Sequence, residues 1–269
     1  MIVKRRVPVA VIGLIALLAV AGCAGTAGDG GAAGQATAGT SSAAGRISGR
    51  ITVLAAASLT EVFTTIGKNF EQAHPGTTVT FSFGSSATLA TQVDQGAPAD
   101  VFASADQRTM KLVTDAGHAA GPRLFATNTL EIAVPPGNPG KITGLADFAN
   151  KNKKTALCAK EVPCGAAAQQ VFQDAGITAR PVSYETDVKA ALQKVEENEV
   201  DAALVYRTDV ASAGDKVEGV EFPEAQQVIN KYPIAALKDS ANPATAAAFV
   251  RYVTGPGERV LQRAGFGAP

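Results

Sequence analysis

Short apolar runs alternate with segments of helical spacing from about residue 51 to the end of the chain. Ile51 to Leu54 is a short run with β-branched residues, which predicts a buried strand. Between Leu59 and Phe70 the apolar residues recur at helical spacing, and His74-Pro75-Gly76 ends the predicted helix. The same two patterns predict further strands at 79–83, 101–103, 130–134, 155–157, 182–184, 202–206 and 232–237, and further helices around 89–93, 166–175 and 188–195, after Asn242 and around 260–261.

Repeated strand–helix pairs are typical of parallel α/β units. Two such sets occur, at 51–105 and 130–206, and a return segment follows Phe222. A folded part of about 220 residues is large for one core but suits two lobes of about 100 residues each. We therefore expect two α/β lobes, with 50–128 plus 225–269 in lobe 1, 129–224 in lobe 2, and chain crossings near 126–130 and 222–231.

The first 22 residues have the pattern of a secretory signal peptide. Three basic residues at 4–6 precede an apolar run from Val7 to Val20, and small residues lead to Cys23. The run is shorter than the roughly 20 apolar residues of a membrane-spanning helix, so cleavage is favoured over the alternative, an uncleaved membrane anchor. Residues 23–49 are rich in Gly, Ala, Ser and Thr and predict a flexible linker. We therefore expect an exported protein.

The charge balance limits the possible ligands. The chain has 24 basic and 24 acidic residues, and the loss of residues 1–22 would leave 21 basic and 24 acidic ones, a net charge of −3. This excludes a strongly basic nucleic-acid binder, and we expect no nucleic-acid partner. Any affinity for an anion must then come from short-range donors.

Cys158 and Cys164 are the cysteines that remain beside Cys23. In an oxidising compartment such a close pair favours a disulfide that closes a short loop. A metal site is the weaker alternative, because the only histidines, His74 and His118, are far away and lack ligand spacing.

Small and hydroxyl-bearing residues stand where the predicted strands end and the next helices begin. These turns are 55–58, 84–88, 163–165 and 185–188, and Tyr206 ends a further strand. Ligands of open α/β sheets bind at such strand ends. Helix starts offer free backbone N–H groups and a partial positive charge, so the arrangement predicts a site for a small anion held by neutral donors.

Each of these residues also has a purely structural interpretation. Ser58 with Glu61 fits a capping box, Ser85 or Ser86 could cap a helix, and Tyr206 could serve only in packing. The motifs of serine hydrolases, P-loop proteins, zinc proteases and dinucleotide-binding enzymes do not occur, so we do not expect an enzyme.

Several stretches resemble the molybdate-binding proteins of ABC importers (the ModA family). They are 51–60, 83–90, 162–165, 187–188, 205–206, 265–266 and, most specific of all, 96–106, which reads Gly-Ala-Pro-Ala-Asp-Val-Phe-Ala-Ser-Ala-Asp. Together they cover the chain from about residue 50 to 267. In addition, Val20-Ala21-Gly22-Cys23 resembles the lipobox of bacterial lipoproteins, which implies lipid attachment at Cys23.

The resemblance implies an α/β, periplasmic-binding-protein-like fold of the second type, with molybdate or tungstate in a cleft between two lobes. It implies ligand hydroxyls on Ser58, Ser86 and Tyr206, and backbone N–H donors at Cys164 and Val188. Many family members have Ala where Cys164 stands, a change that a backbone donor tolerates. The implied protein is a lipid-anchored monomer that serves an ABC permease and its ATPase, needs no cofactor and coordinates no metal through side chains.

Three other functions stay open. The first is a receptor for another tetrahedral oxyanion, such as sulfate or phosphate. The second is a lipoprotein that senses a ligand instead of transporting it, and the third is an enzyme on the same fold. An unprotonated dianion only accepts hydrogen bonds, so its site should exclude carboxylates, and we expect Asp187 to point away or to cap its helix.

Overall fold

The computed structural model describes residues 47–269. The predicted signal peptide, Cys23 and the linker up to residue 46 lie outside the described residues. The strands are β1 (Gly49–Ala56), β2 (Thr77–Gly84), β3 (Val101–Ala103), β4 (Arg123–Val134), β5 (Thr155–Cys158), β6 (Ser183–Glu185), β7 (Ala202–Tyr206), β8 (Glu218–Val220) and β9 (Ile229–Ala236). The α-helices are α1 (Thr60–Ala73), α2 (Ser86–Asp94), α3 (Gln107–Asp115), α4 (Pro163–Asp174), α5 (Val188–Glu196), α6 (Arg207–Ala213), α7 (Pro243–Val253) and α8 (Glu258–Arg263).

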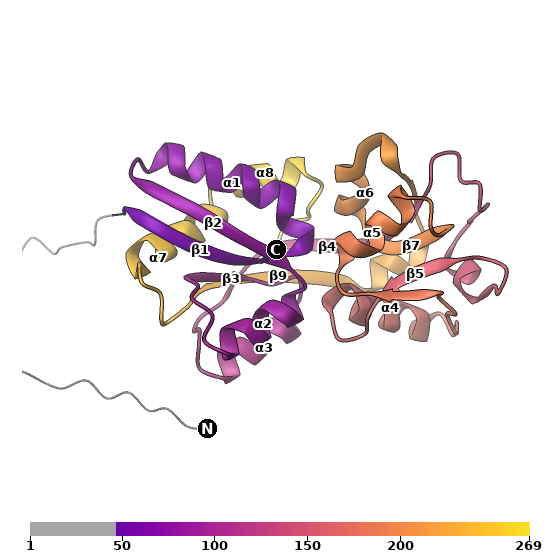
Figure 1. Ribbon diagram of the computed structural model, residues 1–269, viewed down its shortest axis with the longest axis horizontal. Helices are drawn as coiled ribbons and strands as arrows, with labels where there is room; N and C mark the ends of the chain where they lie inside the picture. The colour runs from indigo at the N-terminus through magenta and orange to yellow at the C-terminus, as the bar shows by residue number, and fades with distance from the viewer. Residues whose placement is uncertain (1–46) are drawn as a thin grey trace, which may run out of the picture. The chain divides into compact units, whose positions relative to one another are not determined.

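Strands β4 and β9 connect two halves of one mixed sheet. The strand order is β2-β1-β3-β9-β4-β7-β5-β6, and β8 pairs with β4. The first part of β4 pairs with β9 as far as Thr129, and from Leu130 onward its partner is β7. Figure 1 shows β4 and β9 passing between the two groups of helices. The change of partner lies within the first predicted crossing.

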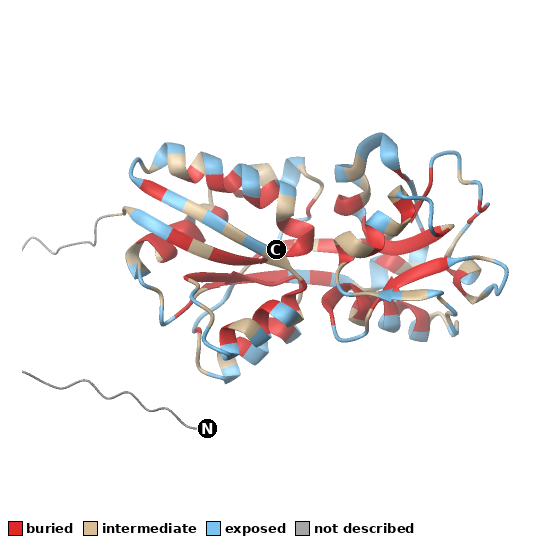
Figure 2. Ribbon diagram, viewed as in Figure 1, coloured by how far each residue is buried: buried red, intermediate tan, exposed pale blue. Residues whose placement is uncertain are grey.

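Buried apolar residues form separate cores on the two sides of this connection. On one side, which we call lobe 1, they come from 51–126 and 232–266. On the other side, lobe 2, they come from 130–225, joined by Ala57. Figure 2 shows the buried positions along the strands and the inward faces of the helices. The lobe boundaries at 128/129 and 224/225 stay a prediction.

Helix α1 illustrates how the sequence pattern builds lobe 1. Val62, Phe63, Ile66 and Phe70 lie on one face and are buried. The rings of Phe63 and Phe70 contact that of Phe249 edge to face, with centroids 6.3 and 5.3 Å apart, a favourable aromatic geometry. The predicted period of 3.6 residues thus matches the packed face.

Several details differ from the sequence-based expectation. Strand β4 runs antiparallel to β7, so the second set of strands is not wholly parallel. Helices α3 and α6 were not predicted: α3 begins after Asp106, whose side chain caps it, and α6 follows β7 without a loop. Strand β1 begins at Gly49, and Ser48 exchanges hydrogen bonds with Thr245, so the end of the predicted linker belongs to the folded part.

Among residues 47–269, no helix combines the length and the apolar character that crossing a bilayer requires.

Candidate ligand-binding site

All five residues predicted to bind the ligand line one small cavity between the lobes. Its volume is about 10 Å³, close to the space of one water molecule and far below that of sites for drug-sized ligands. The cavity is therefore too small for a ligand of that size. The lining residues are Ala56, Ala57, Ser58, Gly84, Ser85, Ser86 and Ala105 from lobe 1, and Val162, Pro163, Cys164, Asp187, Val188 and Tyr206 from lobe 2.

Ser58 does not form the capping box that its sequence allows. It lies in a short 3₁₀ turn, Ala57–Leu59, and the N-cap position of α1 is Leu59, without a side-chain cap. The Ser58 side chain is buried instead, and its Oγ lies 3.0 Å from the hydroxyl of Tyr232. The hydroxyl is thus free of a helix-capping role.

The two serines at the start of α2 have different roles. Ser85 is the N-cap, and its Oγ accepts a hydrogen bond from the backbone N–H of Thr88 at 3.1 Å. Ser86 is the first helical residue and is buried, and its Oγ accepts from the backbone N–H of Ala105 at 3.0 Å. The capping interpretation therefore applies to Ser85 and not to Ser86.

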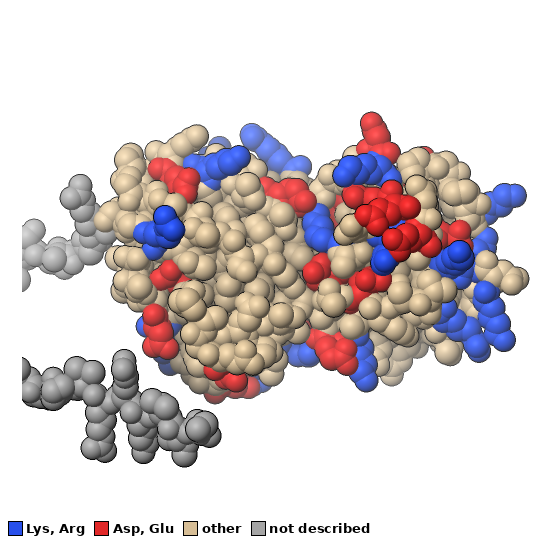
Figure 3. All heavy atoms as spheres, in the orientation of Figure 1, with Lys and Arg blue, Asp and Glu red and all other residues tan. Residues whose placement is uncertain are grey.

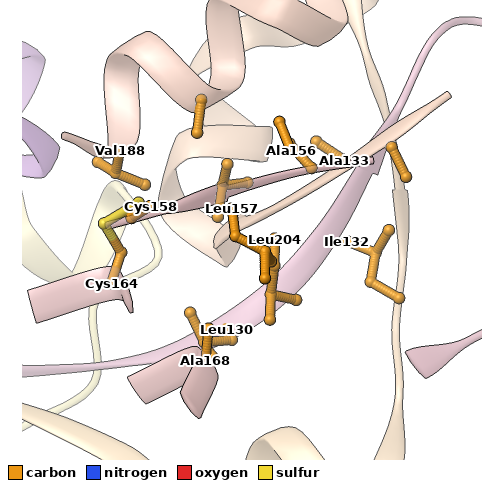
Figure 4. Packing of buried hydrophobic residues seen from close by; sticks show 14 of the residues in the cluster. Leu130, Ile132, Ala133, Ala156, Leu157, Cys158, Cys164, Ala168, Val188 and Leu204 are labelled. Atoms are coloured by element: carbon orange, nitrogen blue, oxygen red, sulfur yellow. A yellow bond between two sulfur atoms is a disulfide. The ribbon is translucent and has the colours of Figure 1, made fainter. Parts of the chain in front are cut away.

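Helix α4 begins at the cavity with a proline, which supplies no N–H. The first backbone donor of the helix is therefore Cys164, and no acceptor among the described residues pairs with it. A disulfide joins Cys164 to Cys158 at the end of β5, the same pair on which the sequence places one. Figure 4 shows this bond among buried residues of lobe 2, near Val188.

The N-terminus of α5 meets the expectation for Asp187. Its Oδ1 accepts hydrogen bonds from the N–H groups of Lys189 and Ala190, at 2.9 and 3.0 Å, and so caps the helix. Val188, the first helical residue, keeps a backbone N–H without a partner among the described residues. One oxygen of the carboxylate is engaged by the helix, and a free donor remains beside it.

Tyr206 ends β7 and is 1 % exposed, so its side chain is buried. Its hydroxyl oxygen accepts a hydrogen bond from Nδ2 of Asn230 at 3.0 Å. Burial, and then the neighbouring Tyr232, raise the pKa of Tyr206 well above its ordinary value. The hydroxyl therefore keeps its proton and remains a donor.

The sequence pattern missed a layer of polar residues behind the cavity. Asn128, Asn230 and Tyr232 lie on the connecting strands β4 and β9 and are buried. A fourth, Asp209, is fully buried; its Oδ2 accepts from the backbone N–H of Tyr206 at 3.2 Å, and its Oδ1 lies 3.2 Å from Nζ of Lys189. The signal that could have found the asparagines is a polar residue inside an apolar strand, since buried polar groups need partners.

The charges around the site do not form a strong positive field. On the face shown in Figure 3, acidic and basic side chains lie intermixed over lobe 2 and are sparser over lobe 1. Within the part of the chain that the structure describes, Asp187 is the only acidic residue that lines the cavity, and no basic side chain lines it. Among residues 47–269 no cluster of three or more His, Cys, Asp or Glu side chains could hold a metal ion. The site offers neutral donors to a group that accepts hydrogen bonds.

Comparisons with known proteins agree with this chemistry. Residues 51–267 match the family described as bacterial extracellular solute-binding protein. The molybdate-binding protein ModA of Mycobacterium tuberculosis is 46% identical over 233 residues, which are 85% of this chain and 89% of that protein. ModA of Escherichia coli is 36% identical, over 81% of this chain and 89% of that protein.

A solved structure has the same fold. The periplasmic molybdate-binding protein of Azotobacter vinelandii superposes with a TM-score of 0.70 at 23% identity, covering 81% of this chain and 99% of that one. The two lobes, the mixed sheet and the cavity between them are thus those of the periplasmic-binding-protein fold. The chain belongs to the family of bacterial extracellular solute-binding proteins that includes the ModA molybdate-binding proteins.

Proposed function

We propose that this protein binds molybdate in the cavity between its lobes, outside the cytoplasm, and delivers it to the permease of an ABC importer powered by an ATPase. One observation carries the proposal: hydroxyls and free backbone N–H groups from both lobes converge on one small cavity. The likeness to the ModA proteins, which are named for molybdate, supports the choice of ion.

The donor set suits an oxyanion that carries no proton. Such an ion only accepts hydrogen bonds, and hydrogen bonds to a charged group contribute about 1.5–3 kcal/mol each. Ser58, Ser86 and Tyr206 supply hydroxyls, and Cys164 and Val188 supply backbone N–H groups at helix starts. Tungstate has the same shape and charge, so we propose that it binds as well. Binding of this kind involves no covalent step and requires no cofactor.

The proposed route to the site begins with export. Residues 1–22 are removed, Cys23 receives the lipid, and residues 24–46 tether the folded part to the outer face of the membrane. A monomer is sufficient, since one chain supplies every donor of the cavity. Closure of the two lobes around β4 and β9 then encloses the ion, as in other two-lobed receptors.

Titration of the chain from residue 24 onward with four oxyanions tests the function. Molybdate and tungstate should raise the free energy of unfolding, by about 2.7 kcal/mol at a concentration 100-fold above Kd. Sulfate and phosphate should do so only at much higher concentration. Absence of any shift with molybdate and tungstate would overturn the proposal, and a shift with sulfate or phosphate alone would assign the protein to that ion. Loss of molybdate uptake on gene deletion would separate transport from sensing.

A further inference from the structure

Asn230 connects the two lobes behind the cavity. It lies on β9 and is 7 % exposed. Its Nδ2 donates one hydrogen bond to the carbonyl oxygen of Ala105, at 2.9 Å, and another to the hydroxyl of Tyr206, at 3.0 Å. Because a carbonyl oxygen only accepts, the NH₂ group and not the amide oxygen must face Ala105. Each of the two amide protons of Asn230 therefore has an identified acceptor.

This assignment determines the direction of the Tyr206 proton. The phenol has a single proton, and its oxygen already accepts from Asn230. Two acceptors remain for that proton: the neighbouring hydroxyl of Tyr232, and a ligand in the cavity that Tyr206 lines. The proton is therefore available to a ligand in the cavity.

The same principle holds for Ser86. Its Oγ accepts from the backbone N–H of Ala105 at 3.0 Å, and a backbone N–H can only donate. The Ser86 proton is thus also free for the cavity. The backbone of Ala105 orients both hydroxyls. Its N–H donates to Ser86, and its carbonyl oxygen accepts from Asn230, which in turn orients Tyr206.

Ser58 is oriented by a longer chain of the same kind. The Oδ1 of Asn128 accepts from the backbone N–H of Thr129 at 3.0 Å, which fixes its Nδ2 as the donor. That Nδ2 lies 3.4 Å from the hydroxyl of Tyr232 and donates to it. Tyr232 can then give its own proton to Ser58, 3.0 Å away, and leave the Ser58 proton free.

We propose that Asn230 is a specificity-determining residue of this site: by donating to the Tyr206 oxygen it turns the Tyr206 proton away from itself, so that the hydroxyl serves the ligand as a donor. The inference rests on the proposed function and deepens it. A fully deprotonated oxyanion can accept from Tyr206 and from both serines. Hydrogen phosphate carries a proton that needs an acceptor, and the acceptor side of Tyr206 is occupied by Asn230. Asn230 thus favours molybdate over protonated oxyanions without touching either.

A double-mutant cycle between Asn230→Leu and Tyr206→Phe tests this positioning role. Leucine keeps the branched shape of the asparagine side chain, although it is larger, and removes the donor. Asn230→Ala, which is smaller, is made alongside, and either variant that unfolds cooperatively decides the test. In the protein that retains Tyr206, loss of Asn230 should weaken molybdate binding by about tenfold. This loss is part of the free energy that one hydrogen bond to a charged group contributes. In the Tyr206→Phe background, the same change should have almost no further effect. The ratio of molybdate to hydrogen-phosphate affinity should fall in the Asn230 single variant.

Asn242→Ala is the matched control, since it removes an asparagine side chain that donates to the carbonyl oxygen of Arg50 and bonds neither Tyr206 nor Tyr232. Its effect should be the same in the Tyr206 background and in the Tyr206→Phe background. Equal losses from the Asn230 change in both backgrounds, or an unchanged ratio between the two ions, would overturn the inference. These outcomes are distinct from failure of the proposed function, in which the unaltered protein would not bind molybdate at all.

Discussion

Glu61 and Lys189 join the two lobes by an ion pair. The Oε2 of Glu61, on α1 of lobe 1, lies 3.0 Å from Nζ of Lys189, on α5 of lobe 2. The same ammonium lies 3.2 Å from Oδ1 of Asp209. Burial alone would lower the pKa of Lys189, but Asp209 and Glu61 together raise it above its ordinary value. The lysine is therefore a charged contact that holds the lobes together.

Replacement of Glu61 by Gln should weaken molybdate binding and speed its release. The change removes the negative charge from the contact across the lobes, whereas Lys189 keeps Asp209. The Glu61 side chain is 55% exposed, so the pair should contribute about 0.2–1 kcal/mol, which is at most a fivefold change in Kd. Stopped-flow release at low and high salt measures it, and the effect should shrink as salt screens the pair.

Asp115→Asn is the control for this change. Asp115 pairs with Lys111 within α3, at 2.6 Å, and both side chains are exposed. Its loss removes one acidic charge from lobe 1 without affecting a contact to lobe 2. Release rates should stay unchanged, and an equal effect of both substitutions would mean that net charge, not the link between lobes, governs release.

Ser86→Ala and Ser85→Ala should separate binding from folding. Ser86 directs its proton to the cavity, so its loss should weaken binding of molybdate by about 1.5–3 kcal/mol. Ser85 caps α2 through Thr88, so its loss should lower the free energy of unfolding by about 1 kcal/mol. Calorimetric titration and denaturant unfolding of both variants check the assignment. If Ser85→Ala impaired binding as much as Ser86→Ala, the assignment of capping to Ser85 and of ligand binding to Ser86 would be wrong.

The binding turns could be predicted because their signals are local. A strand that ends in small and hydroxyl residues before a helix can be recognised within about ten residues of sequence, as at Ser86 and Val188. Asp187 as a cap follows from the same kind of local pattern. These residue preferences belong to helix starts in general, and the tertiary structure does not change them here.

The second layer could not be predicted because its partners are distant in sequence. Asn230 meets Ala105 across 125 positions, and Asn128 meets Thr208 across 80. The antiparallel placement of β9 beside β3 brings the first pair together, and that of β7 beside β4 brings the second; the strand pattern did not reveal these directions. Helix α3 was missed for another reason: Met110 and Val113 are its only large buried apolar residues, too few for a clear period.

Loss of the Cys158–Cys164 disulfide should lower both stability and affinity. The bond closes a loop with a sequence separation of 6, for which the chain-entropy relation gives about 2 kcal/mol of unfolding free energy. The loop carries the Cys164 N–H to the cavity, so its release adds an ordering cost to binding. A variant with both cysteines changed to Ala should therefore bind molybdate more weakly. Titration of this variant, and of the reduced protein, tests the effect; unchanged affinity in both would contradict it.

The pH dependence of stability should report on Asp209. Burial, opposed by Lys189, raises the pKa of Asp209 from 3.8 to about 6. A carboxyl group with a raised pKa in the folded state contributes stability below its unfolded pKa, and this contribution is lost as pH rises through the folded pKa. The difference between the two pKa values corresponds to about 3 kcal/mol of unfolding free energy. The contribution of Asp209 should thus fall by about 3 kcal/mol between about pH 4 and pH 6.

Asp209→Asn isolates this dependence, because asparagine does not titrate. The free energy of unfolding of the original protein minus that of the variant should decrease as the pH rises across this range, and it should level off above about pH 7. Denaturant unfolding at a series of pH values measures the difference. A difference that is constant with pH would mean that Lys189 and the N–H of Tyr206 stabilise the carboxylate as much as burial destabilises it, and a difference that grows as the pH rises would mean that they stabilise it more.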